Sequence, residues 1–167
     1  HEFSHILHQT KTYPKEFEFI SMGLYDPDQW QNQKDTVMHR RGFVTPYASS
    51  APHEDFVEII STYVTNYAGR PTQSWSWDEI IADAAKGKPN PADTLRGDQV
   101  IINKLEIART WLKDKYEINI DSLRSEVMRR QQRIDSPVKM DSIMNELYIE
   151  DESRRIPHDW NFAEHEQ

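Results

Sequence analysis

The chain has 167 residues, and its 20 Lys and Arg against 28 Asp and Glu give a formal net charge of −8. This acidic balance argues against non-specific nucleic-acid binding, which depends on basic side chains that neutralise phosphates. No apolar run approaches the roughly 18–20 residues of a membrane-spanning helix, and the absence of cysteine excludes disulfides, thiolate metal sites and cysteine nucleophiles.

The first twelve residues predict a helix. Phe3, Ile6 and Leu7 recur at helical spacing, and Pro14 follows soon after the expected end of the helix. Because apolar side chains on one face of a helix usually face the core, these three are expected to form its buried face.

The next part of the chain predicts short elements and then a longer helix. Glycine and proline interrupt residues 13–50, where a short helix is expected at about 27–38 and a strand or an extended loop at 42–45. A helix is predicted from Pro52 to Ala68, because proline suits a first turn and an apolar stripe follows. The stripe consists of Phe56, Ile59, Ile60, Tyr63 and Tyr67.

The second half of the chain predicts three further helices. They are expected at about residues 76–87, 94–116 and 121–134, with a linker at 88–91. Ser76 and Glu79 have the spacing of a capping box, and Asp121 is expected to cap the last helix. The tail from residue 136 predicts at most one short helix, at about 141–149, before a loosely ordered end.

The first predicted helix carries an H-E-x-x-H motif, from His1 to His5. Since a helix turns about 100° per residue, the two histidines lie one turn apart on the same face, opposite the apolar side chains. Two imidazoles in this arrangement can bind one Zn²⁺, which lowers the pKa of a bound water, and Glu2 can take the proton of that water. The alternative is a surface helix with solvated histidines, because so short a motif also occurs by chance.

A third metal ligand is needed, because catalytic zinc keeps three protein ligands. In the helix predicted from Pro52, Glu54 and Glu58 lie one turn apart, nearly opposite the apolar stripe. Glu54 can bind the metal, and Glu58 can accept a hydrogen bond from the other ring nitrogen of a metal-binding histidine. Without the H-E-x-x-H motif, the simpler interpretation of these acids is a solvated acidic face.

Two other histidines belong to the same predicted helices. His8 shares a face with His1, but a triad of His1, His5 and His8 is geometrically awkward, because about 10 Å of helical rise separates its ends. A structural role, or a role beside the metal ligands, is therefore favoured for His8. His53 precedes Glu54 but points about 100° away from it, which predicts a residue of the loop or rim.

A basic cluster and two tryptophans complete the candidates. His39, with Arg40 and Arg41, could line a cleft and bind a substrate carboxylate, or could belong to a solvated basic loop. Trp75 and Trp77 flank a helix start, where they are expected to anchor the core rather than to stack on sugars.

The joint pattern resembles a known class of enzymes. H-E-x-x-H followed by Glu54-Asp55-Phe56-Val57-Glu58 resembles the gluzincin metallopeptidases, in which the first Glu of an E-x-x-x-D/E motif is the third zinc ligand. In the lethal-factor-like branch a Tyr seven residues before that Glu assists catalysis, and Tyr47 has this spacing to Glu54. Together with residues 1–9 and 41–48, the pattern resembles the zinc-binding metallopeptidase lipoproteins, also called substrate import-associated zinc metallohydrolase lipoproteins.

The resemblance implies a site, a fold and a location. It implies a zinc-dependent hydrolase of peptide or amide bonds, with Glu2 as general base and Tyr47 as a donor to the developing oxyanion. The zinc ligands would be His1, His5 and Glu54, with Glu58 beside them. Gluzincins place a β-sheet before the zinc helix, so the expected fold is mainly α, the helical C-terminal part of a zincin-like α+β metallopeptidase that starts at the zinc-binding helix.

The expected organisation is a zincin-like catalytic region over residues 1–135 and a tail over residues 136–167. The family is implied to be exported to the cell envelope of Gram-negative bacteria, with a lipid anchor on the precursor. Its implied partners are a peptide or protein substrate and an envelope complex for nutrient import.

Two other functions stay open from the sequence alone. The chain could be a binding or scaffold module that keeps an inactive, stabilising zinc site. It could instead bind copper through the amine and ring of an N-terminal His1, as oxidative polysaccharide-cleaving enzymes do. Those enzymes are β-sandwiches, which the helical pattern disfavours.

Overall fold

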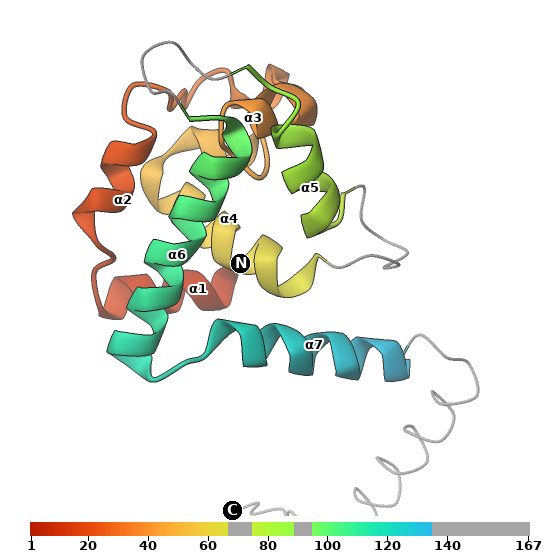
Figure 1. Ribbon diagram of the computed structural model, residues 1–167. Helices are drawn as coiled ribbons and strands as arrows, with labels where there is room; N and C mark the ends of the chain where they lie inside the picture. Colours follow the sequence, from red (N-terminus) through yellow and green to blue (C-terminus); the bar gives the residue numbers. More distant parts are fainter. Residues whose placement is uncertain (67–74, 89–94, 135–167) are drawn as a thin grey trace, which may run out of the picture. The chain divides into compact units, whose positions relative to one another are not determined.

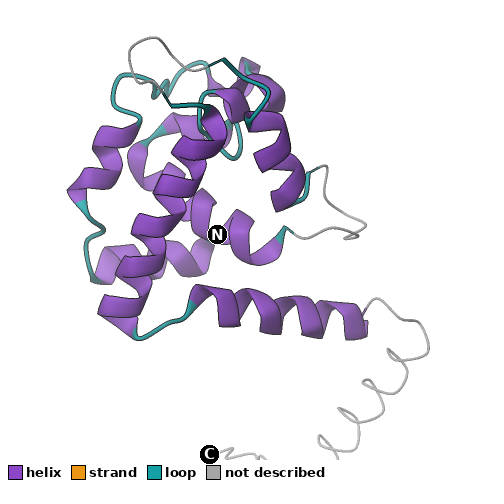
Figure 2. Cartoon of the chain, in the orientation of Figure 1, coloured by secondary structure: helices purple, strands orange, loops and turns teal. Residues whose placement is uncertain are grey.

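The computed structural model describes residues 1–66, 75–88 and 95–134. In these ranges the chain forms helices and no strand, which confirms the mainly helical prediction (Figures 1 and 2). The helices are α1 (Glu2–Thr10), α2 (Lys15–Ile20), η1 (Trp30–Asn32), α3 (Asp35–Arg40), η2 (Tyr47–Ser50), α4 (Pro52–Thr65), α5 (Trp77–Ala84), α6 (Gly97–Tyr116) and α7 (Ile120–Ile134).

The chain divides into two compact units, His1–Met128 and Arg129–Gln167. The tail predicted at residues 136–167, including its short helix, lies outside the described residues, and so does the larger part of the linker predicted at 88–91. Within the described ranges, every helix is too short or too polar to cross a lipid bilayer.

The core of the first unit lies between α4 and α6. The long helix α6 runs alongside α2, α4 and α5 (Figure 1). Phe56 of α4 is fully buried and meets three aromatic rings, with centroids 4.8 Å away for Tyr13, 5.0 Å for Phe17 and 5.1 Å for Trp111. Four residues of the predicted apolar stripe, Phe56, Ile59, Ile60 and Tyr63, therefore pack in the core, whereas Tyr67 lies outside the described residues. Trp77 is buried, as expected.

The C-terminal end of α1 is tied to α6 by two hydrogen bonds to backbone carbonyls. The Tyr116 hydroxyl donates to the carbonyl of Leu7 at 2.5 Å, and the indole N–H of Trp111 donates to the carbonyl of Thr12 at 3.0 Å. The carbonyl of Leu7 also accepts from the backbone N–H of Lys11 at 3.0 Å, and Thr12 follows the end of α1. The two bonds therefore fix the end of α1 beside α6.

The buried face of α1 differs from the prediction. Leu7 is buried as expected, but Phe3 and Ile6 are 60% and 61% exposed, and Ser4 is buried instead. The reason is that α1 packs against α4, so Ser4 and Leu7 turn inward while Phe3 and Ile6 face outward. The spacing of the apolar residues correctly predicted the helix, but it did not predict which face of the helix packs against the rest of the chain.

Two local predictions were also wrong, and one short helix was not predicted. The helix expected at 27–38 is replaced by η1 and the short α3, and α2 was not predicted. Asp121 is not the cap of α7, because the side chain of Asn119 accepts the backbone N–H bonds of Asp121 and Ser122, each at 3.0 Å. The Asp121 carboxylate instead accepts a hydrogen bond from Tyr63 at 2.5 Å.

Residues 42–45 form a loop whose start requires glycine. Gly42 has a φ of +89°, and a Cβ on it would lie 2.3 Å from a methyl carbon of Val100. A side chain at this position would be strained by the backbone and blocked by α6. The sharp turn lets the loop run from α3 to η2, beside the first turn of α4.

A buried ion pair joins this loop, α4 and α6. Lys104 Nζ lies 2.6 Å from Asp55 Oδ2, and both side chains are 0% exposed. The ammonium also donates to the carbonyl of Gly42 at 2.8 Å, and the hydroxyl of Tyr25 donates to Asp55 at 3.0 Å. Burial raises the pKa of Asp55 and lowers the pKa of Lys104, while their attraction opposes both shifts.

Candidate metal centre

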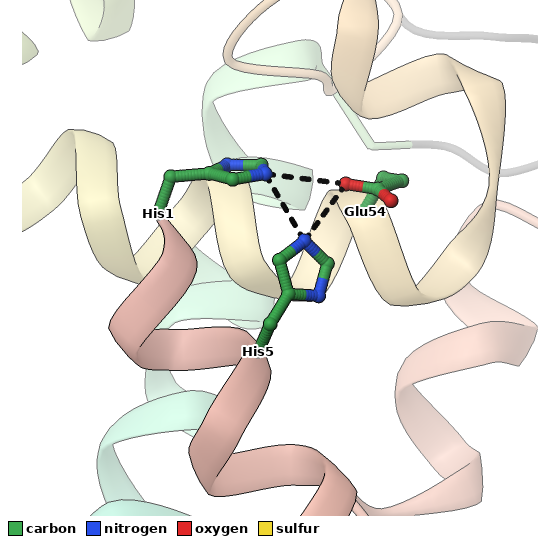
Figure 3. A group of neighbouring side chains, drawn as sticks. All are labelled: His1, His5 and Glu54. Atoms are coloured by element: carbon green, nitrogen blue, oxygen red, sulfur yellow. Dashed lines mark hydrogen bonds and ion pairs between the residues drawn. The ribbon is translucent and has the colours of Figure 1, made fainter. Parts of the chain in front are cut away.

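The side chains of His1, His5 and Glu54 converge where the start of α1 meets the first turn of α4 (Figure 3). The two imidazole Nε2 atoms lie 3.0 Å apart, and Glu54 Oε2 lies 3.2 Å from that of His5 and 3.5 Å from that of His1. A tetrahedral zinc ion with bonds of about 2.0–2.1 Å separates its ligand atoms by about 3.3–3.4 Å. The spacing of the three atoms therefore fits one such ion.

The positions of the protons near these three atoms also favour a cation bound between them. The Nδ1 of His1 lies 2.8 Å from Glu58 Oε1, and a carboxylate only accepts, so this nitrogen carries the proton and Nε2 a lone pair. Glu54 Oε2 is buried and has no hydrogen-bond partner. Because buried polar atoms are normally paired, a cation between these atoms would stabilise lone pairs that face one another. The residues present fit Zn²⁺.

No other group of three metal-binding side chains converges within 4.8 Å in the described part of the chain. The three residues are also partly shielded from solvent, with side-chain exposures of 28% for His1, 16% for His5 and 14% for Glu54. A site of this kind keeps one side open to solvent, as a catalytic metal requires.

A hydrogen-bonded chain supports His1 from the side of α4. The hydroxyl of Thr45 donates to Glu58 Oε2 at 2.6 Å and accepts from the backbone N–H of Ala48 at 3.1 Å. Burial raises the pKa of Glu58, and the hydrogen bond from Thr45 opposes this rise. Sequence reasoning found Glu58 but missed Thr45, whose only signal is its place in the segment 41–48 that resembles the metallopeptidases.

Glu2 and Tyr47 lie at the edge of the site. Glu2 is the exposed first residue of α1. The ring of Tyr47 lies 5.8 Å from the ring of His1 and rests edge-on against Trp30 at 4.9 Å. Burial raises the pKa of Tyr47, and neighbouring carboxylates, Glu54 foremost, add to the rise, so the hydroxyl keeps its proton and can donate. Trp30 was not singled out from the sequence.

Two further histidines border the ligands. His8 Nε2 lies 3.0 Å from His5 Nδ1, and burial lowers the pKa of His8, with the nearby rings of His5 and His53 adding to this effect. His53 is half exposed at the rim, as predicted, but its Nε2 also lies 3.3 Å from Glu54 Oε1. The three converging residues are thus contacted by two further imidazoles and by Glu58.

Both interpretations of His39 were wrong. Its side chain is only 1% exposed, and its Nδ1 lies 3.3 Å from Asp83 Oδ2 while its ring meets Trp75 edge-on at 5.0 Å. It is therefore a core residue, neither the lining of a cleft nor part of a solvated loop. Arg40 and Arg41 are exposed. The partly buried Trp75 packs against the core, as expected of an anchor.

Comparisons with known proteins agree with this chemistry. A family model described as "Putative zinc-binding metallo-peptidase" matches residues 1–121. The chain is also similar to a solved structure described as a putative zinc-binding metallo-peptidase from Bacteroides caccae ATCC 43185, with 34% identity and a TM-score of 0.67. The match covers 80% of this chain and 45% of that one, so this chain spans less than half of its relative. No curated protein matched.

Proposed function

Because the chain belongs to the zinc-binding metallo-peptidase family whose model it matches, we propose that it hydrolyses peptide or amide bonds with a zinc ion held by His1, His5 and Glu54. One observation carries the proposal. Three ligand atoms at 3.0, 3.2 and 3.5 Å from one another meet at a single point, and the carboxylate oxygen among them has no hydrogen-bond partner.

The residues around this point have distinct roles. A zinc ion supplies Lewis acidity, which polarises a substrate carbonyl and makes water a nucleophile near neutral pH. Glu2 would take the proton of the attacking water and pass it to the leaving amine. The Tyr47 hydroxyl, which its raised pKa keeps protonated, would donate to the developing oxyanion. Glu58 would hold the ring of His1 through the bond at 2.8 Å.

Zinc removal tests this function. We expect about one zinc per chain, and hydrolysis of a mixed peptide library that stops on chelation and returns on addition of Zn²⁺. Glu54→Gln should lose zinc and activity together, because an amide oxygen is a weaker ligand than a carboxylate. Glu106→Gln, which changes an exposed acid on α6 in the same way, should keep both.

The alternative of a scaffold module makes a different prediction for the same experiment. It expects zinc to raise the unfolding temperature of the chain while every peptide of the library stays intact. That result, with full zinc occupancy, would contradict the catalytic proposal and leave only the metal site.

The proposal includes a location and a partner. The motif resemblance to import-associated lipoproteins supports an exported protein of the cell envelope that acts beside nutrient import. Fractionation of cells that express the precursor checks this part independently of the catalytic assay, and recovery in the cytosolic fraction would contradict it.

A further inference from the structure

We propose that His8 is a positioning residue of the metal centre, which accepts a hydrogen bond from the Nδ1–H of His5 and so directs the Nε2 of His5 at the metal. This inference rests on the proposed function, because it assigns His5 as a metal ligand. It adds a third histidine to the residues of the metal centre, with a role different from that of the two proposed ligands.

The starting observation is a difference between the two ligand histidines. Histidines that bind a metal almost always donate their other ring N–H to an acceptor, which fixes the tautomer and the orientation of the ring. His1 uses the carboxylate of Glu58 at 2.8 Å. The atom that faces the Nδ1 of His5, at 3.0 Å, is the Nε2 of His8. An imidazole thus takes the place that a carboxylate has beside His1.

The direction of this bond follows from the position of the two ring nitrogens. The Nε2 of His5 faces Glu54 and His1, at 3.2 and 3.0 Å, so its lone pair is needed there. The proton of His5 is therefore on Nδ1, and His8 must accept at Nε2 and keep its own proton on Nδ1. Because His8 meets the opposite side of the His5 ring, it does not join the same ion as a ligand.

His8 is held in place by the core. Its ring lies edge-on to Tyr13, with centroids 5.8 Å apart. Tyr13 in turn stacks on Phe56 at 4.8 Å and donates its hydroxyl to Glu18 at 2.9 Å. The acceptor for His5 is therefore supported by packed aromatic rings, which restrict its orientation more than solvent would.

Variants of His8 separate positioning from mere packing. His8→Phe keeps a flat ring against Tyr13 but has no acceptor, and should weaken Zn²⁺ binding about 10–100-fold. The side-chain oxygen of His8→Gln can occupy the position of Nε2 and should restore most of the affinity. His8→Asn places its oxygen nearer the backbone and should not restore it. Gln9→Ala, an exposed change on the same helix, is the control.

The affinities are measured by competition with a chromophoric chelator, and the geometry by the visible absorption of the Co²⁺-loaded chain. The unfolding temperature of the metal-free variants reports packing alone, and that of His8→Phe should match that of the wild type. If His8→Phe fails to fold, the difference in Zn²⁺ affinity between His8→Gln and His8→Asn still tests the role of His8. Wild-type affinity in the Phe or Asn variant overturns the role of His8, as does equal loss in Gln and Asn.

The outcomes also distinguish this inference from the proposed function. A wild-type chain that does not bind Zn²⁺ refutes the metal site, and the role of His8 with it. A wild-type chain that binds Zn²⁺ with unchanged affinity in His8→Phe leaves the proposed function intact and refutes the role of His8 alone.

Discussion

Replacing Lys104 with Met should destabilise the chain by about 3–5 kcal/mol, the usual cost of removing one partner of a buried ion pair. Asp55 would be left fully buried without its cation, and among the described residues the Tyr25 hydroxyl would remain as its side-chain hydrogen-bond donor. Because Asp55 adjoins Glu54 in the first turn of α4, zinc binding should weaken as well. Chemical denaturation of the metal-free and zinc-loaded chain measures both effects.

Two controls separate the ion pair from the loss of a long side chain. Lys113→Met changes an exposed lysine on the same helix and should alter stability by at most about 0.5 kcal/mol. The double change of Lys104→Met with Asp55→Leu should recover much of the loss, since apolar pairs often replace buried charges well. Equal stability of Lys104→Met and wild type would refute the structural role of the pair.

Glu2→Gln should lower peptide hydrolysis about 10²–10⁴-fold while the zinc content stays unchanged. Gln keeps the size of the side chain but cannot take a proton, and Glu2 is not one of the three converging ligands. The rate of cleavage and the zinc content are measured on the same preparation. Glu16→Gln, an exposed change on α2, serves as the matched control. Full activity with Gln at position 2 would refute Glu2 as the base.

The sequence was sufficient to single out the three side chains that converge in the structure, because part of their geometry is local. Residues four apart share a helix face, so His1 and His5 come together within α1, and Glu54 and Glu58 within α4. Their meeting across two helices depends on tertiary packing, which the resemblance implied and the structure describes. The role of Thr45 rests on a contact with Glu58 across two elements, which spacing does not encode. His8 lies one turn after His5 on the same helix, where spacing already favoured a place beside the metal-binding residues.

The missed features of the fold have a similar physical origin. Lysine is among the residues least often buried, so nothing in the sequence marked Lys104 as a core residue. The burial of Phe3 and Ile6 was predicted from periodicity, but the packing of α1 on α4 decided which face turned inward. Asp and Asn are both common helix caps, so the sequence did not distinguish Asp121 from Asn119. In the structure the Asp121 carboxylate accepts a hydrogen bond from the Tyr63 hydroxyl instead.

The most direct test of the account is anomalous diffraction at the zinc edge from crystals of the zinc-loaded chain. We expect one strong peak within about 2.0–2.2 Å of the Nε2 atoms of His1 and His5 and of Glu54 Oε2. His8 should remain beside His5 without reaching the ion. Absence of a peak at this point, or a zinc bound through other side chains, would contradict the central claim.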